Sequence, residues 1–296
     1  MKLIKGGKNN MNKKIFKKIL RIYLFIIIFI IIAMPITLIF MQSSILFHPW
    51  HDEKSYTQLQ NLDDSIFEEL SIDNNGKKLS GWFKHNIDDP KGPLVIFMGG
   101  NAQNSSNTCF NFLNANIYKY FNGYNLMIVD YPGYGLSEGI TSEETMFDAA
   151  LKMYDYAATL DCVDTDNIVV LGYSIGTGVA TYLASQRNVN GLILIAPYDE
   201  ILSLYNNKIN IFHGPLKSLA KYKFDSKYYA QSIKVSPLII SSYDDEIISY
   251  KFSQNLAKYF KNTEKILMLD NNVKHNYYFL QEDVLTSISE YLKNRL

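Results

Sequence analysis

The sequence is poor in cysteine and has no excess of charge of either sign. Its 296 residues include only two cysteines, Cys109 and Cys162. Two cysteines specify neither a disulfide framework nor a zinc site, and we expect the protein to need no metal and no cofactor. The 29 Lys and Arg residues balance the 29 Asp and Glu residues. The chain as a whole therefore has no basic surplus with which to bind nucleic acid.

Charge is nevertheless distributed unevenly along the chain. Residues 1–21 contain eight Lys or Arg and no acid, which leaves 21 basic against 29 acidic residues in the rest of the chain. An acidic body argues against nucleic acid as a partner. Residues 22–41 contain no charged side chain. At about 1.5 Å per residue they are long enough to cross a hydrocarbon core of about 30 Å, so we expect a membrane-spanning helix.

This apolar stretch is predicted to be an anchor that stays attached. A secretory signal has an apolar core of about 7–15 residues followed by a small-x-small cleavage site. Here the core is longer, and the residues from Met41 to Phe47 contain no such site. The basic residues before the core place the N-terminus in the cytoplasm. We expect a single-pass membrane protein with a cytoplasmic tail at 1–21, an anchor at 22–41 and the main domain, 42–296, on the periplasmic, extracellular or luminal side.

Beyond the anchor, short apolar runs alternate with helical patterns, which favours an α/β fold with a mainly parallel sheet and helices on both faces. Nearly continuous apolar character is typical of strands that are covered on both faces. The predicted central strands are 94–98, 126–130, 167–171, 192–195, 238–241 and 266–269. Two earlier segments, 67–72 and 78–84, alternate more strongly and are separated by a turn signal at 73–76. They predict an antiparallel hairpin at one edge of the sheet.

The predicted helices cover 104–120, 142–160, 175–186, 248–260 and 282–293. The stretch 198–234 interrupts this rhythm between two strands, and its leucines and aromatic residues are interleaved with lysines. Such an insertion can act as a lid over a binding site, or it can consist of helices packed on the sheet edge with no role in binding.

A serine lies where a predicted buried strand turns into a helix. Gly172-Tyr173-Ser174-Ile175-Gly176 follows the apolar run 167–171 directly. This G-x-S-x-G pattern in a strand-to-helix turn predicts a nucleophile elbow, in which the two glycines remove side chains that would collide with neighbouring elements. The simpler alternative is a serine that only caps a helix.

A serine nucleophile needs a histidine base and an acid that orients it, and on this kind of sheet the acid and the histidine follow later strands. His275 is the only histidine that follows a late strand. Asp244, Asp245 and Glu246 follow the strand before it. Asp245 is favoured because two isoleucines come directly after Glu246, where the next helix is expected to begin, and Asp244 remains the alternative.

The oxyanion formed during acyl transfer needs two backbone N–H donors. One is expected from Ile175, directly after the serine and at the positive end of its helix. The other is expected from Asn101, in the glycine-rich loop 99–103 that follows the first central strand. An ordinary glycine-rich turn is the alternative reading of that loop.

The segment from Asp130 to Gly139 reads DYPGYGLSEG. Together with the elbow, the acid and the histidine, it resembles the D-Y-x-G-Y-G-x-S-x-G segment of α/β-hydrolase serine enzymes, in particular the membrane-anchored α/β-hydrolase domain-containing proteins. The similarity covers about residues 45–295. The resemblance implies an α/β-hydrolase fold, a Ser-Asp-His triad and hydrolysis of ester, thioester or sometimes amide bonds. Where the family usually reads H-G-N-A-G-N, residues 99–104 read GGNAQN, so Gly99 replaces the histidine that normally supports the oxyanion loop.

These observations together predict a membrane-tethered serine hydrolase. It would cleave a carboxylic ester or thioester through an acyl-enzyme on Ser174, with Asp245 and His275 as its partners. An apolar insertion beside a bilayer favours a small-molecule or lipid-like acyl substrate. Two alternatives remain open: a serine peptidase of the proline-releasing α/β-hydrolase type, and a catalytically silent binding protein with the same fold. The sequence leaves the oligomeric state open.

Overall fold

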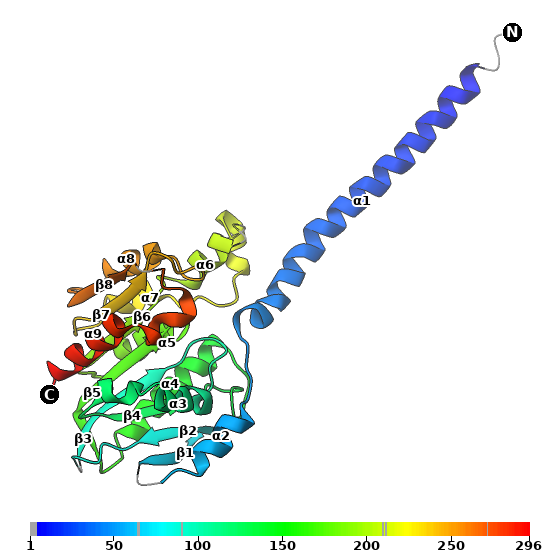
Figure 1. Cartoon of the computed structure of the whole chain (residues 1–296). Helices are drawn as coiled ribbons and strands as arrows, with labels where there is room; N and C mark the ends of the chain where they lie inside the picture. The colour runs from blue at the N-terminus through cyan, green and yellow to red at the C-terminus, as the bar shows by residue number, and fades with distance from the viewer. Residues whose placement is uncertain (1–4, 64–65, 90, 209, 211, 271) are drawn as a thin grey trace.

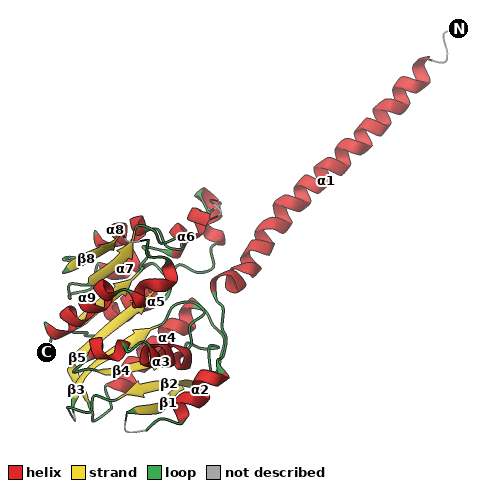
Figure 2. Cartoon of the chain, in the orientation of Figure 1, coloured by secondary structure: helices red, strands yellow, loops and turns green. Residues whose placement is uncertain are grey.

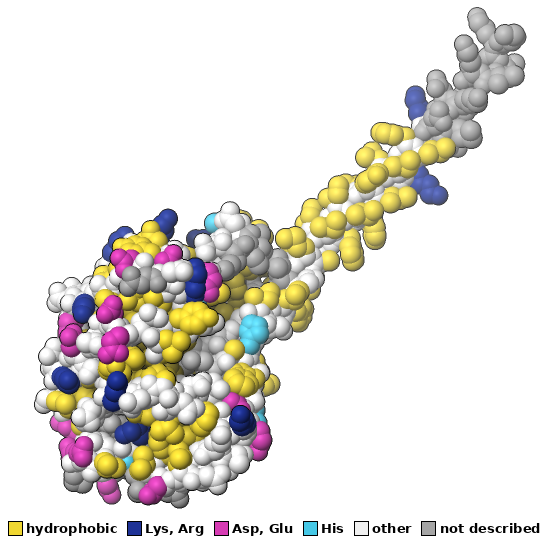
Figure 3. Space-filling view, in the orientation of Figure 1, with side chains coloured by type: hydrophobic (Ala, Val, Ile, Leu, Met, Phe, Trp, Pro, Cys, Tyr) yellow, Lys and Arg dark blue, Asp and Glu magenta, His cyan; other side chains and the backbone are white. Residues whose placement is uncertain are grey.

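A computed structural model describes residues 5–63, 66–89, 91–208, 210, 212–270 and 272–296. A single long helix, α1 (Lys5–Leu46), projects from a folded body (Figure 1). Within α1, the part from Ile15 to Leu46 is long and apolar enough to cross a membrane, and none of the residues in its most apolar stretch is buried against the body. Figure 3 shows its apolar side chains in view along most of its length, in contrast to the mixed surface of the body.

The body is built on one eight-stranded sheet, as the strand pattern predicts. The strands lie in the order β1-β2-β4-β3-β5-β6-β7-β8. Their bounds are β1 (Phe67–Asn74), β2 (Lys77–Lys84), β3 (Gly92–Met98), β4 (Asn125–Val129), β5 (Val163–Tyr173), β6 (Gly191–Ile195), β7 (Leu238–Ser242) and β8 (Lys265–Leu269). β1 and β2 form the predicted antiparallel hairpin at the edge, and β2 is antiparallel to β4. The strands from β4 to β8 are parallel, so their carboxyl ends meet at one edge of the sheet.

Helices cover both faces of the sheet (Figure 2). The first face packs against α4 (Glu143–Ala157), α5 (Gly176–Gln186) and residues of α8 (Tyr250–Ala257). The second packs against α3 (Ser105–Asn114), the 3₁₀ helix η1 (Ile117–Phe121) and α9 (Glu282–Lys293). β3, β4 and β6 are buried along their whole length, which explains why their sequences lack the polar alternation of half-exposed strands.

Two helix predictions are wrong in their bounds. The continuous helix expected at 104–120 is divided into α3 and η1, because Asn116 takes a left-handed conformation with φ of 53° and ends the helical path. The helix expected at 248–260 is the shorter α8. The helix expected at 142–160 begins where predicted, because Ser142 and Thr145 form a reciprocal capping box.

The insertion at 198–234 contains α6 (Ile201–Lys208), the 3₁₀ helix η2 (Gly214–Leu219) and α7 (Ser226–Ala230). Five of its aromatic side chains are buried in the core of the first face: Tyr198, Tyr205, Phe212, Tyr222 and Phe224. Ile209 and Ile211, which belong to the same apolar pattern, lie outside the described residues. A further short helix, α2 (Glu53–Gln60), was not expected from its polar sequence, and it begins where the Asp52 side chain accepts the N–H of Ser55.

Candidate active site

Ser174 sits at the turn between β5 and α5 in a strained backbone conformation. Its φ is +54°, in the left-handed region that side chains other than glycine rarely adopt. A side chain at Gly172 would come within 2.7 Å of Ala180, and one at Gly176 would collide with the carbonyl oxygens of Met98 and Gly99. The serine N–H is held by the Ile195 carbonyl oxygen at 2.9 Å. The sharp turn therefore requires both glycines that the sequence supplies.

Three side chains from different strand ends meet at this turn. His275 Nε2 lies 2.9 Å from Ser174 Oγ. On the other side of the ring, His275 Nδ1 lies 2.9 Å from Asp245 Oδ2 and 3.1 Å from Oδ1. All three residues are buried, with exposed fractions of 6 to 8%. Each of the three groups thus lies within hydrogen-bond distance of the next, which is the arrangement that a serine nucleophile, a base and an orienting acid require.

The Asp245 carboxylate is held by several donors in addition to the histidine. Its Oδ1 accepts the backbone N–H groups of Ile247 at 2.9 Å and Ile248 at 2.8 Å. Its Oδ2 accepts the Tyr278 hydroxyl at 2.9 Å. Burial works to raise the pKa of Asp245, but the hydrogen bond and charge of His275 and the two amides outweigh burial and hold that pKa below its ordinary value. The carboxylate is therefore ionised at neutral pH and can stabilise a positive charge on His275.

The neighbouring acids lie differently. The Asp244 N–H donates to Ser242 Oγ at 3.1 Å, and the Asp244 carbonyl accepts Lys274 Nζ at 3.4 Å. The Glu246 carboxylate accepts the backbone N–H of His275 at 3.2 Å. Of the three candidate acids, the structure thus brings the Asp245 carboxylate to the imidazole ring, and Glu246 holds the histidine backbone.

Sequence reasoning missed two tyrosines that surround the histidine. The Tyr173 hydroxyl donates to the His275 carbonyl at 2.7 Å, and its ring stacks on the imidazole at 5.4 Å between centroids. Tyr278 lies three residues after His275 in the 3₁₀ helix η3 (His275–Leu280), where positions i and i+3 share a face. That spacing was the available signal for Tyr278. Tyr173 is inside the elbow motif, but only the fold shows that it reaches the histidine.

The two expected oxyanion donors are both available. In the described part of the chain, neither the Ile175 N–H nor the Asn101 N–H has a hydrogen-bond acceptor within the protein. In contrast, the N–H of Gly100, the residue directly before Asn101, donates to Gln103 Oε1 at 2.6 Å. A side chain at Gly100 would come within 2.9 Å of the Tyr173 ring, so glycine is required there.

The loop 99–103, called the Asn101 loop below, is also held by residues from other segments that the sequence did not indicate. Asn101 Oδ1 accepts the Tyr134 hydroxyl at 2.9 Å and the His48 N–H at 2.9 Å. The Tyr131 hydroxyl donates to the Gly99 carbonyl at 3.1 Å. These contacts come from the segment before α2 and from the loop after β4, and they hold a loop that has no side chain at residue 99.

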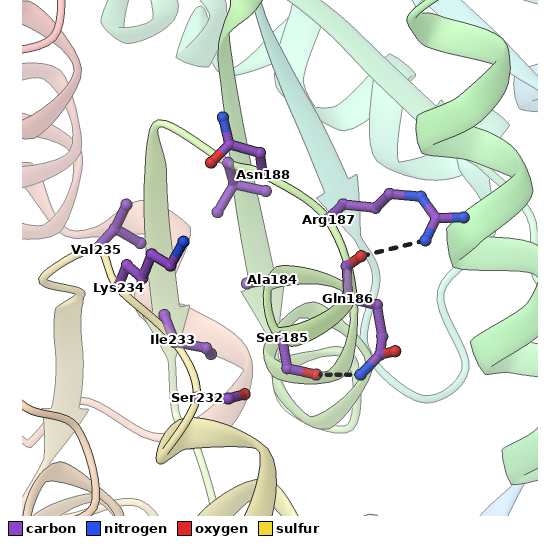
Figure 4. A pocket seen from close by; sticks show the side chains of 10 residues that line it. Ala184, Ser185, Gln186, Arg187, Asn188, Ser232, Ile233, Lys234 and Val235 are labelled. Atoms are coloured by element: carbon purple, nitrogen blue, oxygen red, sulfur yellow. Dashed lines mark hydrogen bonds between the residues drawn. The ribbon is translucent and has the colours of Figure 1, made fainter.

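Two hollows on the body differ in their relation to this site. The pocket in Figure 4 lies between the C-terminal end of α5 and residues 232–235. It is separated from Ser174 by the 11 residues of α5, which is about 16 Å of helix, so it is remote from the serine. A second hollow of about 400 Å³ is flanked by Gln103, Asn276, Phe279 and Leu280 and is floored by residues of α3 and η1. It borders both the Asn101 loop and the segment that carries His275. Among the described residues, no group of three or more His, Cys, Asp or Glu is placed to hold a metal ion.

Comparisons with known proteins agree with this architecture. A family model described as the alpha/beta hydrolase fold matches residues 92–227. The chain is 27% identical over 184 residues to an uncharacterized protein of Mycobacterium tuberculosis, covering 62% of this chain and 63% of that protein. It is 29% identical over 171 residues to alpha/beta hydrolase domain-containing protein 17C of Xenopus tropicalis, covering 56% and 50% of the two chains. The matches thus span less than two thirds of the length of these relatives.

Solved structures share the same fold. Est1E from Butyrivibrio proteoclasticus with ferulic acid bound superimposes with a TM-score of 0.63 at 19% identity, covering 76% of this chain and 98% of that one. The sheet order and the sequence and structure matches show that the chain has the α/β-hydrolase fold, and its sequence is similar to those of α/β-hydrolase domain-containing proteins.

Proposed function

We propose that the protein is a membrane-tethered serine hydrolase that cleaves a carboxylic ester or thioester through an acyl-enzyme on Ser174. The observation that carries this proposal is the continuous hydrogen-bonded chain from Ser174 through His275 to Asp245. The fold and its esterase neighbours support hydrolysis as the reaction class. The order of the three residues along the chain is also the one typical of this fold.

In this mechanism, Ser174 Oγ attacks the acyl carbon while His275 Nε2 takes its proton. The imidazolium then gives the proton to the leaving alcohol or thiol, and Asp245 holds the ring with Nε2 facing the serine. Water, activated by the same histidine, hydrolyses the acyl-enzyme in the second step. The N–H groups of Ile175 and Asn101 stabilise the oxyanion in both steps.

The substrate class is inferred from a hollow of about 400 Å³ that borders the Asn101 loop and the segment after His275, and that Ser174 and His275 do not themselves line. This hollow combines the apolar side chains of Phe112, Phe279 and Leu280 with the polar groups of Gln103 and Asn276. Such a surface suits an apolar acyl chain with a polar group near the scissile bond. Substrates of this kind partition into a bilayer, which α1 places next to the body.

The chain organisation proposed for this activity has a cytoplasmic tail at 1–21, an anchor at 22–41 and a hydrolase domain at 42–296, in which the insertion 198–234 is either a lid or a set of helices packed on the sheet edge. The excess of basic residues before the anchor supports a cytoplasmic N-terminus and a catalytic domain on the other side of the membrane. Protease added to the outside of intact cells or spheroplasts should digest the body. Complete protection of the body would contradict this orientation.

Labelling by a fluorophosphonate probe tests the nucleophile directly. The full-length protein in membranes should be labelled, and Ser174→Ala should abolish labelling and reduce turnover of short p-nitrophenyl esters by about 10³-fold or more. Ser185→Ala, at the other end of α5, is the matched control and should behave as wild type. Undiminished labelling of Ser174→Ala would exclude this serine as the nucleophile. A wild-type protein that is neither labelled nor active would favour the silent binding protein.

A further inference from the structure

The segment that leaves the membrane helix is docked firmly on the insertion. Gln42 near the end of α1 is only 2% exposed, and its amide donates to the Leu219 carbonyl at 2.8 Å and accepts the Lys221 N–H at 2.7 Å. Ser43 Oγ lies 2.7 Å from the Tyr222 hydroxyl. The ring of Phe47 is buried against Tyr222, with centroids 4.9 Å apart. The chain therefore leaves α1 along a fixed path (Figure 1).

The next residue on this path, His48, contacts the Asn101 loop with a defined hydrogen-bond pattern. Asn101 Oδ1 accepts three donors, which are the His48 N–H, the Tyr134 hydroxyl and the Ala102 N–H. This fixes the orientation of the amide, because only its oxygen can accept hydrogen bonds. Asn101 Nδ2 consequently donates to His48 Nδ1 at 2.8 Å. His48 thus contacts the Asn101 side chain twice: its ring accepts a hydrogen bond from Asn101 Nδ2, and its backbone N–H donates one to Asn101 Oδ1.

Trp50 extends this contact to the next residue of the loop. Its indole Nε1 donates to the Ala102 carbonyl at 2.5 Å, and its own carbonyl accepts the Gly135 N–H at 3.0 Å. His48 and Trp50 therefore both form hydrogen bonds to the Asn101 loop, and both also form hydrogen bonds to the loop after β4.

We propose that residues 42–50 are a working part of the active site, in which His48 and Trp50 position the Asn101 N–H for the oxyanion. This inference rests on the proposed function of Ser174. His48 and Trp50 are positioning residues, because they act through the backbone of Asn101 and do not touch the reacting atoms. The loop itself has glycine at residues 99 and 100, so it has no side chain of its own there with which to fix this geometry.

The proposal predicts a specific kinetic effect. The oxyanion contact strengthens only in the transition state, so a looser loop should lower kcat and leave KM nearly unchanged. The His48 and Trp50 contacts are on the surface, where one hydrogen bond has a modest effect. For His48→Ala we therefore expect kcat to fall about tenfold, which is less than the loss of about 10²-fold or more seen when an oxyanion donor is removed outright.

The experiment compares four variants of the full-length protein in membranes or detergent micelles. His48→Ala removes the ring acceptor, and His48→Asn restores an acceptor oxygen at the place of Nδ1. Trp50→Phe removes the indole donor but keeps an aromatic ring. His85→Ala is the control. His85 pairs with Glu68 just after the end of β2, and that end of β2 lies beside the start of β4. His85 is therefore at the opposite edge of the sheet from the carboxyl ends of the parallel strands. Measurements are kcat and KM for a p-nitrophenyl ester, thermal midpoint, and deuterium exchange of the peptide that contains residues 99–104.

The expected result is that His48→Ala and Trp50→Phe lower kcat and speed deuterium exchange of the loop peptide, at an unchanged thermal midpoint. His48→Asn should recover most of both properties, and His85→Ala should match wild type. Wild-type kcat and wild-type exchange in His48→Ala and Trp50→Phe would overturn the proposal. The exchange measurement does not depend on activity, so a protein with no Ser174-dependent turnover but a loosened loop would reject the hydrolase function and still establish that His48 positions the loop.

Discussion

The substitution Asp245→Asn tests how the acid controls the histidine. Two backbone N–H groups, of Ile247 and Ile248, point at Asp245 Oδ1. They will hold the oxygen of an asparagine side chain at the same place, because an amide NH₂ there would face two donors. The NH₂ group must then occupy the place of Oδ2, next to His275 Nδ1 and the Tyr278 hydroxyl.

In that arrangement the histidine takes the wrong tautomer. Its Nδ1 must accept the new NH₂ donor, so the ring proton moves to Nε2, which faces Ser174 Oγ. An Nε2 that already carries a proton cannot remove one from the serine. We expect kcat/KM to fall by about 10³- to 10⁴-fold, equivalent to about 4 to 5 kcal/mol of transition-state stabilisation.

The assay is kcat/KM for a short p-nitrophenyl ester together with the rate of fluorophosphonate labelling. Asp244→Asn is the matched control, because its carboxylate makes no contact with the ring, and it should retain activity within about threefold of wild type. Thermal midpoints of both variants show whether folding is preserved. An Asp245→Asn protein with activity within tenfold of wild type would refute the tautomer reasoning, and a severe loss in Asp244→Asn alone would assign the acid to that residue.

Three further substitutions probe the site and its frame. Tyr278→Phe removes a donor to the Asp245 carboxylate, so kcat should fall about fivefold and the acid limb of the pH–rate profile should move to higher pH; an unchanged profile would deny Tyr278 this role. Gly176→Ala drives a methyl group into the Met98 and Gly99 carbonyls and should cost about 3 kcal/mol or more of unfolding free energy, whereas Ser185→Ala on the same helix should cost little. Burial raises the pKa of Asp130 to about 6, so this carboxyl favours the folded state at low pH, and that contribution is lost as pH rises through about 6. Relative to Asp130→Asn, wild type should therefore lose about 2 kcal/mol of stability between about pH 4 and pH 7, and a difference independent of pH would contradict the shift.

The sequence predicts the strands and their order better than it predicts where individual helices end. Fully buried strands such as β3, β4 and β6 leave apolar runs in the sequence, so their existence and order follow from local patterns. The break at Asn116 could not be predicted, because it depends on one residue adopting a left-handed conformation. The predicted ends of helices are least accurate where the conformation of a single residue decides them.

The candidate site shows the same division. The proximity of Ser174 and His275 could be predicted from motif and chain order alone, since Ser174 directly follows β5 and His275 lies in the segment after β8. The roles of Tyr173 and His48 could not, because they depend on contacts between residues that are 102 and 53 positions apart in the chain. Contacts of that length follow only from the completed fold.

The docking of Gln42 also limits how the body can move against a bilayer. The uncharged run ends at Met41 and the first buried contact with the insertion is made by the next residue, so no slack linker separates anchor and body. A tethered enzyme with a flexible stalk would sweep a hemisphere of solvent around its attachment point. If α1 crosses a bilayer as we propose, this docking would hold the body at one height and one tilt, and the proposed active site would meet its substrates by lateral diffusion in the plane of the leaflet. Encounter then becomes a two-dimensional search, governed by the surface density of the substrate and not by its concentration in water.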